Sequence, residues 1–542
     1  MAKSKFLIIL SFIAVFSMQA KNNTLKYIIY FKDKTFDTNV KALFNTKAIQ
    51  QRNRFNIPFD ERDYPVNANY IEQLKQNNAI ILHTTNWLNA ALIRIDDKKL
   101  ATIAQFPFIA SIVKIETAKS HKNTMSVSTQ DACVGNEDEL AFEDQYTSSF
   151  PQVNLLHGEY LHEQGFNGEN MTIAVCDNGF YNVYNNPAYA AVMADNRLLG
   201  TYDFVNNDST VHDDTNGKHG TNCFSFIAGK KDSQYIGTAT KSSYYLFQTE
   251  NNNSERLQEE FNLASALERC NQLGVDVVSI SLGYTTFDLA SENHDTTDLR
   301  NNSTPAAKAV NMASSKGILV CVAAGNEGLK PWKYISTPSD ADSAFCIASV
   351  DINGVVAGSS AYGLPNDARV KPNVAAMGVS AKYLNDAGNV SSGGGTSYAT
   401  PQLAGLAACL WQAFPTKTNW EIKTAIEQSA SQYLTPDKRI GYGIPDFKKA
   451  YDLLANPTFV STKSIIDDIH IFPNPFQNIL AVQCNGNANL QSIQLMNSVG
   501  QMVYSAYTPT NNMLDFSYLS TGMYLLQITT DKGVFIKKII KE

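Results

Sequence analysis

Beyond residues 1–20, the chain lacks any apolar run long enough to cross a membrane. A spanning helix needs about 18 or more such residues, and no later segment of the 542 residues approaches that length. A strong positive charge is also missing, because 44 Lys and Arg stand against 51 Asp and Glu, for a net charge of −7. No long basic run lies between the two termini. These absences argue against an integral membrane protein and against a nucleic-acid-binding protein.

The apolar run at the N-terminus is of another kind. Lys3 and Lys5 precede the apolar segment 6–16, and Ala20 closes a short polar stretch. This order of positive, apolar and small residues predicts a secretory signal peptide over residues 1–20, although Met18 stands where a small residue is usual. We therefore expect an exported protein.

Cysteine is sparse, and its spacing excludes the common zinc sites. The eight cysteines form no Cys-x-x-Cys pair. Four lie in apolar segments, where cysteine behaves as a small hydrophobic residue: Cys176, Cys321, Cys346 and Cys409. The other four are left open as members of disulfide bridges, which exported chains can form: Cys133, Cys223, Cys270 and Cys484.

Four segments of different composition follow the signal peptide. Residues 26–117 predict a small α+β unit, and the polar, acidic residues 118–149 predict a linker. From 150 to 456, apolar strand-like runs alternate with amphipathic helices, which predicts an α/β domain with a mainly parallel sheet flanked by helices. Residues 465–542 alternate strand-like runs with Asn, Gly and Pro turns, which predicts a β-sandwich.

The α/β segment allows individual elements to be predicted. Continuous runs of apolar residues predict buried strands, and a helical period that ends at a glycine predicts helices. The expected strands are 171–175, 243–248, 275–283, 317–326 and 344–350, and the expected helices are 259–274 and 305–317.

One serine lies where a glycine-rich loop meets a helix, in SSGGGTSYATPQLAG at residues 391–405. The residues after the glycines are apolar on nearly every face, which predicts a buried helix. Pro401 is expected near the first turn of this helix, where a missing N–H costs little. Ser397 then lies at a helix N-terminus, which favours negative charge. That position suits a nucleophile and equally a helix N-cap, so the segment alone leaves both open.

A nucleophilic serine needs a histidine base, and the histidine needs a carboxylate that orients it. The chain has only eight histidines. Within the α/β segment, His157 and His162 are expected on a surface helix and His294 in a polar loop, which leaves His212 and His219. His219 has the better context, although a half-buried structural histidine is the plainer interpretation of this residue alone.

Two further polar residues lie at the ends of predicted strands. Asp177 ends the apolar segment that begins at residue 171, and the carboxyl ends of parallel strands are where open α/β sheets hold their sites. Asn326 ends the apolar run expected as a strand at 317–326 and could donate its amide to a developing oxyanion. Taken alone, each is equally well a turn residue.

These residues stand in motifs that recur along the chain in a fixed order: AVCDNGF, HGTNCFSFIAG, VDVVSISLG, AAGNEG and GTSYATPQLAG. In these motifs, residues 150–455 resemble the subtilisin-like serine proteases (subtilases). The resemblance implies that Asp177, His219 and Ser397 form a catalytic triad and that Asn326 belongs to the oxyanion hole. It also implies two substrate-binding strands, which contain Ser281, Leu282, Gly283, Ala323, Ala324 and Gly325.

Several positions depart from the family's usual residues. Asn178 follows the aspartate in place of Thr or Ala, Asn222 replaces the second histidine of the HGTH motif, and Asn373 replaces an aspartate. Tyr284 stands where many relatives have a second glycine. We therefore expect an altered pocket for the residue before the scissile bond.

The flanking segments fit the same resemblance. Residues 26–117 resemble the subtilase prosegment, an intramolecular chaperone and inhibitor, so 118–149 is expected to contain the processing site. The tail 465–542, with IFPNPF at 471–476, resembles the C-terminal sorting domain of Bacteroidetes type IX secretion substrates. The resemblance thus implies a serine endopeptidase for protein or peptide substrates, exported through the type IX machinery and secreted or attached at the cell surface.

The implied chemistry requires no cofactor, and the sequence assigns no metal ligands. Structural calcium is common in the family, but Asp213 and Asp214 are merely acidic loop residues by sequence.

Three other interpretations predict different features. An α/β-hydrolase needs Gly-x-Ser-x-Gly and a later histidine, but Ala399 replaces the second glycine and only His470, in the tail, follows. An inactive subtilase-like surface binding protein would keep the fold, and the altered residues Asn178 and Asn222 leave this open. A carbohydrate-binding or adhesin module would depend on the tail, so that residues 465–542 would bind a ligand unaided.

Overall fold

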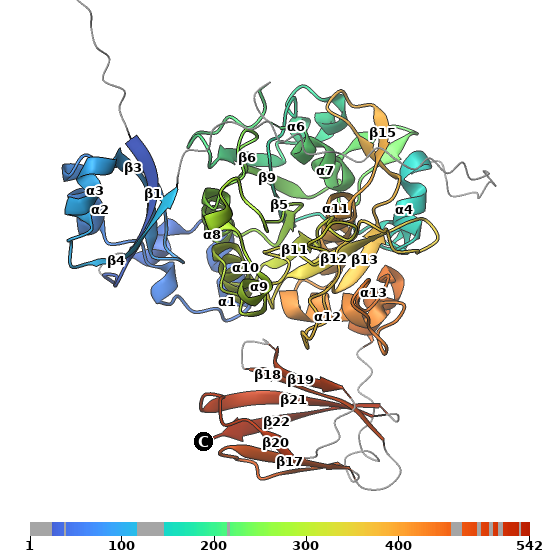
Figure 1. The fold of residues 1–542 in the computed structure, drawn as a ribbon. Coiled ribbons are helices and arrows are strands. Elements are labelled where there is room, and N and C mark those ends of the chain that lie inside the picture. The colour runs from blue at the N-terminus through green and yellow to red at the C-terminus, as the bar shows by residue number, and fades with distance from the viewer. Residues whose placement is uncertain are drawn as a thin grey trace, which may run out of the picture.

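The computed structural model describes residues 24–36, 39–115, 146–213, 217–456, 469–484, 489–497, 502–507, 513–530 and 533–542. These residues form three folded regions (Figure 1). The predicted signal peptide lies outside the described residues, as does most of the predicted linker.

The N-terminal region is a four-stranded antiparallel sheet in the order β2-β3-β1-β4. Alternate residues of a strand face opposite sides, so Tyr27 and Ile29 of β1 pack on its helices while Ile28 faces Phe261 of the next region. The elements are β1 (Thr24–Phe31), η1 (Val40–Leu43), α1 (Thr46–Arg54), η2 (Glu61–Asp63), α2 (Ala68–Gln76), β2 (Ile80–Thr85), β3 (Ala90–Asp96), α3 (Asp97–Ile103) and β4 (Ile109–Ile115).

The central region is built on a seven-stranded sheet in the order β13-β12-β11-β10-β5-β9-β6, and all six strand pairs are parallel. The strands are β5 (Thr172–Asp177), β6 (Leu198–Asp203), β9 (Ser243–Gln248), β10 (Val277–Ile280), β11 (Leu319–Ala323), β12 (Phe345–Val350) and β13 (Val374–Met377). Short two-stranded ribbons pair β7 (Lys230–Lys231) with β8 (Tyr235–Ile236) and β14 (Ala381–Leu384) with β15 (Val390–Gly393).

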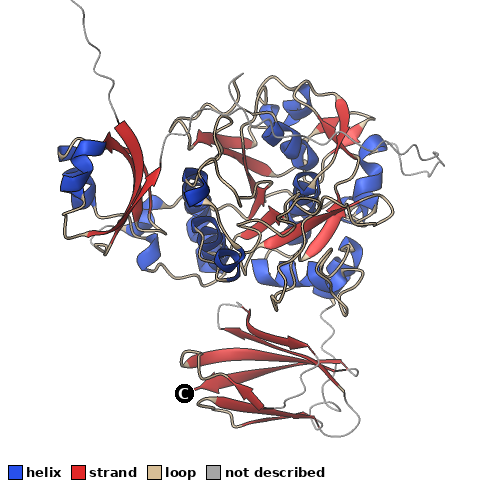
Figure 2. Ribbon diagram, in the orientation of Figure 1, coloured by secondary structure: helices blue, strands red, loops and turns tan. Residues whose placement is uncertain are grey.

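Helices cover both faces of this sheet (Figure 2). Ile173 and Val175 of β5 pack in the cluster that contains α11, whereas Ala174 and Cys176 pack in the cluster of α8 and α10. The helices are η3 (Thr147–Ser149), α4 (Phe150–Asn154), α5 (Glu159–Glu163), η4 (Pro187–Tyr189), α6 (Ala190–Ala194), α7 (His219–Ala228), α8 (Gln258–Leu273), η5 (Ala290–Glu292), α9 (Thr296–Arg300), α10 (Pro305–Ser315), α11 (Thr396–Ala413), α12 (Asn419–Ser429) and α13 (Phe447–Ala455).

The strand order reverses between β5 and β10. The chain continues from β5 to β6 and β9 on one side of it, and then to β10, β11, β12 and β13 on the other. Asp177 ends β5 and Ser281 directly follows β10. Both residues therefore lie at the carboxyl-end crevice where open α/β sheets bind ligands.

The C-terminal region contains two antiparallel sheets, in the orders β16-β17-β20 and β19-β18-β21-β22. Their apolar faces share one core, which includes Leu480 of the first sheet and Ile493 of the second. The strands are β16 (Ile469–Phe472), β17 (Ile479–Cys484), β18 (Leu490–Asn497), β19 (Met502–Tyr507), β20 (Met513–Asp515), β21 (Gly522–Thr530) and β22 (Gly533–Lys541).

The predicted fold class is confirmed in all three regions, and the mainly parallel sheet is wholly parallel. The strands β6 and β13 at the two edges of the sheet were not predicted. No helix in the described part of the chain combines the length and apolar character needed to cross a membrane.

Replacing Leu403 by alanine should lower the free energy of unfolding of the central region by about 2–5 kcal/mol. This side chain has no exposed surface and lies in the cluster between α11 and the sheet. Urea unfolding followed by tryptophan fluorescence measures the change. Leu434→Ala is the matched control, because Leu434 is 72% exposed; equal losses for the two variants would contradict the assigned packing.

Candidate active site

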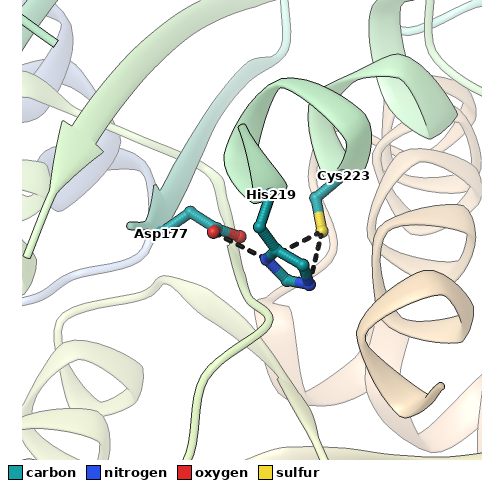
Figure 3. A group of neighbouring side chains, drawn as sticks. All are labelled: Asp177, His219 and Cys223. Atoms are coloured by element: carbon teal, nitrogen blue, oxygen red, sulfur yellow. Dashed lines mark hydrogen bonds and ion pairs between the residues drawn. The ribbon is translucent and has the colours of Figure 1, made fainter. Parts of the chain in front are cut away.

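The site begins with a buried carboxylate at the end of β5. Asp177 has no exposed surface. Its Oδ1 accepts the backbone N–H of Asn178 at 2.8 Å and lies 2.7 Å from Nδ1 of His219 (Figure 3). Since a carboxylate only accepts hydrogen bonds, Nδ1 must donate, and Nε2 of the neutral ring is then an acceptor.

His219 is the first residue of α7, and its side chain is 26% exposed. Burial by itself would lower the pKa of this imidazole, but the adjacent Asp177 carboxylate outweighs burial and holds the pKa well above its usual 6.5. The ion pair thus favours the imidazolium.

Cys223 lies one turn further along α7, at the i+4 position that faces His219. Its Sγ is 3.7 Å from Nδ1 and 3.8 Å from Nε2 of His219, and 3.5 Å from the carbonyl oxygen of Ser397. Burial raises the pKa of the thiol, so it stays protonated. Cys223 and Cys270 are free and buried, so within the described residues the structure decides the open question of bridge membership against both. Cys133 and the side chain of Cys484 lie outside the described residues.

Ser397 is the second residue of α11, and the helix cap is Gly395. The cap interpretation of Ser397 was therefore wrong. Its hydroxyl donates to the carbonyl oxygen of Ser281 at 3.2 Å, and the hydroxyl of Ser281 donates back to the carbonyl oxygen of Ser397 at 2.9 Å. These reciprocal bonds hold the start of α11 against the segment that follows β10.

Pro401 explains why the Ser397 carbonyl needs outside donors. The prediction that this proline lies near the first turn was wrong, because the helix begins at Thr396 and Pro401 is its sixth residue. A proline has no N–H to bond the carbonyl four residues earlier, which here is that of Ser397. Ser281 Oγ and Cys223 Sγ donate to it instead.

Asn326 lies just beyond β11 and faces the N-terminus of α11. Its Oδ1 accepts the backbone N–H of Thr396 at 3.0 Å and the Thr396 hydroxyl at 3.2 Å. These donors identify the oxygen of the side-chain amide and leave Nδ2 as a donor for another group. Gly395 precedes Thr396 with a φ of 135°, a backbone conformation that residues with a side chain rarely adopt.

The residues predicted to bind substrate follow two adjacent strands, Ser281–Gly283 after β10 and Ala323–Gly325 at the end of β11. Ser336, which sequence reasoning missed, fills the space beside both glycines. A Cβ added to Gly283 would lie 2.0 Å from Ser336 Oγ, and a Cβ added to Gly325 would lie 3.2 Å from the same atom. This hydroxyl is buried and has no hydrogen-bond partner among the described residues. No sequence motif would have revealed it.

Tyr284 turns away from this segment into the protein. It is 1% exposed, and its hydroxyl donates to Oε1 of Glu250 at 2.6 Å. Tyr284, which stands where many relatives have glycine, therefore places a buried aromatic ring and its partner Glu250 on the inner side of the segment that follows β10.

The other histidines of this region are engaged elsewhere. His212 packs edge-on against Tyr184, and His294 pairs with buried Glu260. His157 precedes α5 and pairs with Asp446. His162 lies on α5, which is partly exposed as predicted, but its own side chain turns inward: its Nε2 bonds the carbonyl oxygen of Thr238, and burial lowers its pKa.

An acidic cluster of Glu250, Glu255 and Glu259 lies near the site, with carboxylate oxygens within 4.8 Å of one another. Calcium favours such oxygens, but Glu250 accepts the Tyr284 hydroxyl and Glu259 accepts the backbone N–H groups of Asn251 and Arg256. Burial raises the pKa of Glu250 to about 7 and that of Glu255 to about 8. Two of the three carboxylates thus already accept hydrogen bonds from protein donors, and we assign no calcium to the cluster. Asp214 lies outside the described residues.

Comparison with known families identifies the central region. A model of the subtilase family matches residues 168–443, half of the chain, and the chain therefore belongs to this family. Residues 26–131 match the peptidase S8 propeptide domain of Bacteroidota, and residues 470–542 match the secretion system C-terminal sorting domain.

Curated relatives agree with this membership. The chain is 28% identical over 294 residues to the thermostable alkaline protease of Halalkalibacterium halodurans, covering 54% of this chain and 70% of the relative. It is 26% identical over 367 residues to subtilisin NAT of Bacillus subtilis subsp. natto, and the match covers 67% of this chain and 81% of the relative. The chain is thus a subtilisin-like serine endopeptidase with a propeptide and a sorting tail, secreted or located at the cell surface.

Replacing Asp177 by asparagine should lower the pKa of His219, because the charge that raises the pKa is removed while burial remains. NMR titration of the chain labelled at histidine Cε1 measures this. The His157 signal serves as the internal control, because that residue pairs with Asp446 instead. An unchanged His219 pKa would contradict the assigned cause.

Proposed function

We propose that Asp177, His219 and Ser397 form a catalytic triad that hydrolyses peptide bonds through an acyl-enzyme. The observation that carries the proposal is the 2.7 Å hydrogen bond between His219 Nδ1 and the buried Asp177 carboxylate. This bond fixes the tautomer in which Nε2 can accept a proton. The Cys223 sulfur, in contact with both His219 and the Ser397 carbonyl, supports placing base and nucleophile side by side.

The reaction begins when the Ser397 hydroxyl leaves Ser281 and turns to Nε2, a change that substrate binding can cause. His219 takes the proton as Oγ bonds to the substrate carbonyl carbon, and the imidazolium is stabilised by Asp177. The tetrahedral intermediate collapses, the C–N bond breaks and His219 protonates the leaving amine. In the second half of the reaction, water attacks the acyl-enzyme while His219 takes its proton. The ester bond to Ser397 then breaks, which releases the carboxylic acid and restores the Ser397 hydroxyl. No cofactor enters these steps.

The oxyanion of the tetrahedral intermediate would be held by Asn326 Nδ2 and the backbone N–H of Ser397. The first four N–H groups of a helix have no partner within it, and Ser397 is the second residue of α11. The helix dipole adds a favourable field for negative charge at this end.

The substrate backbone would lie between Ser281–Gly283 and Ala323–Gly325, whose glycines permit close approach. Ser336 lies beside Gly283 and is buried, so it supports this segment from inside the protein.

Because only neutral His219 can take the Ser397 proton, its raised pKa places the acid limb of the activity profile above pH 6.5.

We further propose the order of maturation. The signal peptide 1–20 is removed on export, the prosegment 26–117 is cut off within 118–149, and residues 150–456 act as the protease. The type IX machinery recognises the tail 465–542 as its sorting signal.

A fluorophosphonate probe should label the processed chain, and Ser397→Ala should abolish labelling. Ser392→Ala is the matched control, because that exposed hydroxyl only bonds the carbonyl oxygen of Ser380. Mass spectrometry of the labelled peptide identifies the residue. A processed wild-type chain that does not react would instead support the inactive surface binding protein.

Replacing Asn326 by leucine should lower kcat by about 10²–10³-fold, the loss known for oxyanion-hole amides in this family, with little change in KM. Steady-state cleavage of a peptide substrate measures both constants. Asn326→Asp keeps the oxygen that Thr396 uses, replaces the N–H donor by a second oxygen and adds a negative charge at that position. If this variant retains full activity, Asn326 merely supports the start of α11.

A further inference from the structure

Between β1 and α2, the prosegment contains a segment that contributes no strand to its sheet. Residues 39–67, which we call the docking arm, lie between β1 and α2 and contain η1, α1 and η2. The arm has its own small core of Val40, Phe44 and Ala48, packed with Phe59 and Tyr64.

A buried ion pair preorganises the arm. The Arg52 guanidinium lies 4.7 Å and 4.4 Å from the ring centres of Phe44 and Phe59 and bonds Asp63 at 2.5 Å. The side chains of Arg52 and Asp63 are 3% and 0% exposed. The arm is thus a unit that can present fixed groups to a partner.

The first set of contacts joins the arm to the amino-terminal edge of the central sheet (Figure 1, α1 below the sheet of the N-terminal region). Lys47 Nζ bonds Asp276 Oδ2 at 2.6 Å, one residue before β10. Gln51 Nε2 bonds Asp276 Oδ1 at 3.3 Å. The same Asp276 carboxylate accepts the backbone N–H of Thr172 at the start of β5.

The second set caps the carboxyl end of α8. Asn45 donates its backbone N–H to the carbonyl oxygen of Gln272 and its Nδ2 to that of Leu273, both at 2.9 Å. The last carbonyls of a helix have no partner within it, so the arm satisfies groups that α8 leaves open. The fit is close, because a Cβ on Gly274 would lie 2.6 Å from the Ala48 nitrogen.

In the third set of contacts, the cation belongs to the protease and the carboxylates belong to the arm. Lys316, just beyond α10, bonds Asp60 and Asp63 of the arm, each at 2.9 Å. Its side chain is 2% exposed. The arm therefore gives a cation to Asp276 and receives one from Lys316, which is the complementarity that fixes partner and register in specific interfaces.

This surface is separate from the contacts that the prosegment sheet makes, among them Ile28 with Phe261, and from the candidate active site. The β2–β3 turn binds α8 elsewhere, where Glu268 accepts hydrogen bonds from Thr85, Asn86 and Trp87. A cavity of about 320 Å³, lined by Arg62 of the arm and by Trp87, lies between the two contacts. The catalytic groups lie at the opposite, carboxyl edge of the sheet.

We infer that residues 271–276 and 316–317 of the protease form an exosite for the docking arm, which keeps the prosegment bound after the chain between them is cut. The inference rests on the proposed role of the prosegment as inhibitor. It adds that the docking arm, in addition to the face of the prosegment sheet, sets the rate at which the cut prosegment leaves the protease.

The test uses the full chain with Ser397→Ala, a C-terminal affinity tag and a recognition sequence for an unrelated protease inserted within 118–145. After the cut, the rate at which the prosegment leaves the immobilised chain is measured. Lys316→Met should speed release by about 30-fold or more, as for a buried ion pair that loses one partner. Lys47→Met should speed it by about threefold to fivefold, because this pair is partly solvated.

Lys32→Met is the matched control, because Lys32 Nζ bonds only Pro107 within the prosegment. Asp276→Asn keeps the acceptor for Thr172, and combined with Lys47→Met it should release the prosegment no faster than either change alone. Thermal unfolding shows that each variant is folded. Release at the control rate in both lysine variants would overturn the exosite. Catalysis plays no part in this assay, so failure of the triad proposal would show in probe labelling and not in release.

Discussion

The carboxylate of Asp177 has no contact with solvent, and a buried charge is stable only when donors face it. His219 and the Asn178 N–H supply those donors, and this requirement fixes how α7 meets β5. Gly220 makes the approach possible, since a Cβ there would lie 2.4 Å from the Gly179 carbonyl oxygen and 2.9 Å from the Asp177 Cβ. The ring orientation, its tautomer and its raised pKa all follow from this one contact.

At the start of α11, a buried polar group is again satisfied by donors from other elements. Pro401 leaves the Ser397 carbonyl without its helical partner, and Ser281 and Cys223 supply donors from two other elements. Ser281 thereby joins the segment after β10 to the proposed nucleophile, and Cys223 joins α7 to it. A change in any of these three elements would move the hydroxyl of Ser397 relative to His219.

The two edges of a parallel sheet offer different chemistry, and this chain uses both. At the carboxyl edge, loops and helix N-termini supply N–H donors for a reacting carbonyl. At the amino edge, helix carboxyl ends expose carbonyl oxygens and favour cations and amide donors. Asn45 of the docking arm donates to two such carbonyl oxygens of α8, and Lys47 and Gln51 donate to the Asp276 carboxylate at the same edge. The prosegment can therefore hold the protease at an edge where no reaction takes place.

The sequence by itself determined the local features. Continuous apolar runs predicted the inner strands, because strand burial depends on neighbours along the chain. The resemblance carried by the motifs predicted that Asp177 and His219 meet, as they do, and the roles of Ser397 and Asn326 in the same site stay predictions. Local signals were too weak for the edge strands β6 and β13. Only the tertiary structure decided the position of Pro401 in α11, the burial of His162, the free thiol of Cys223 and the place of Ser336. These depend on contacts between segments far apart in the chain, such as Ser281 with Ser397, 116 residues away, and no local pattern encodes such a distance.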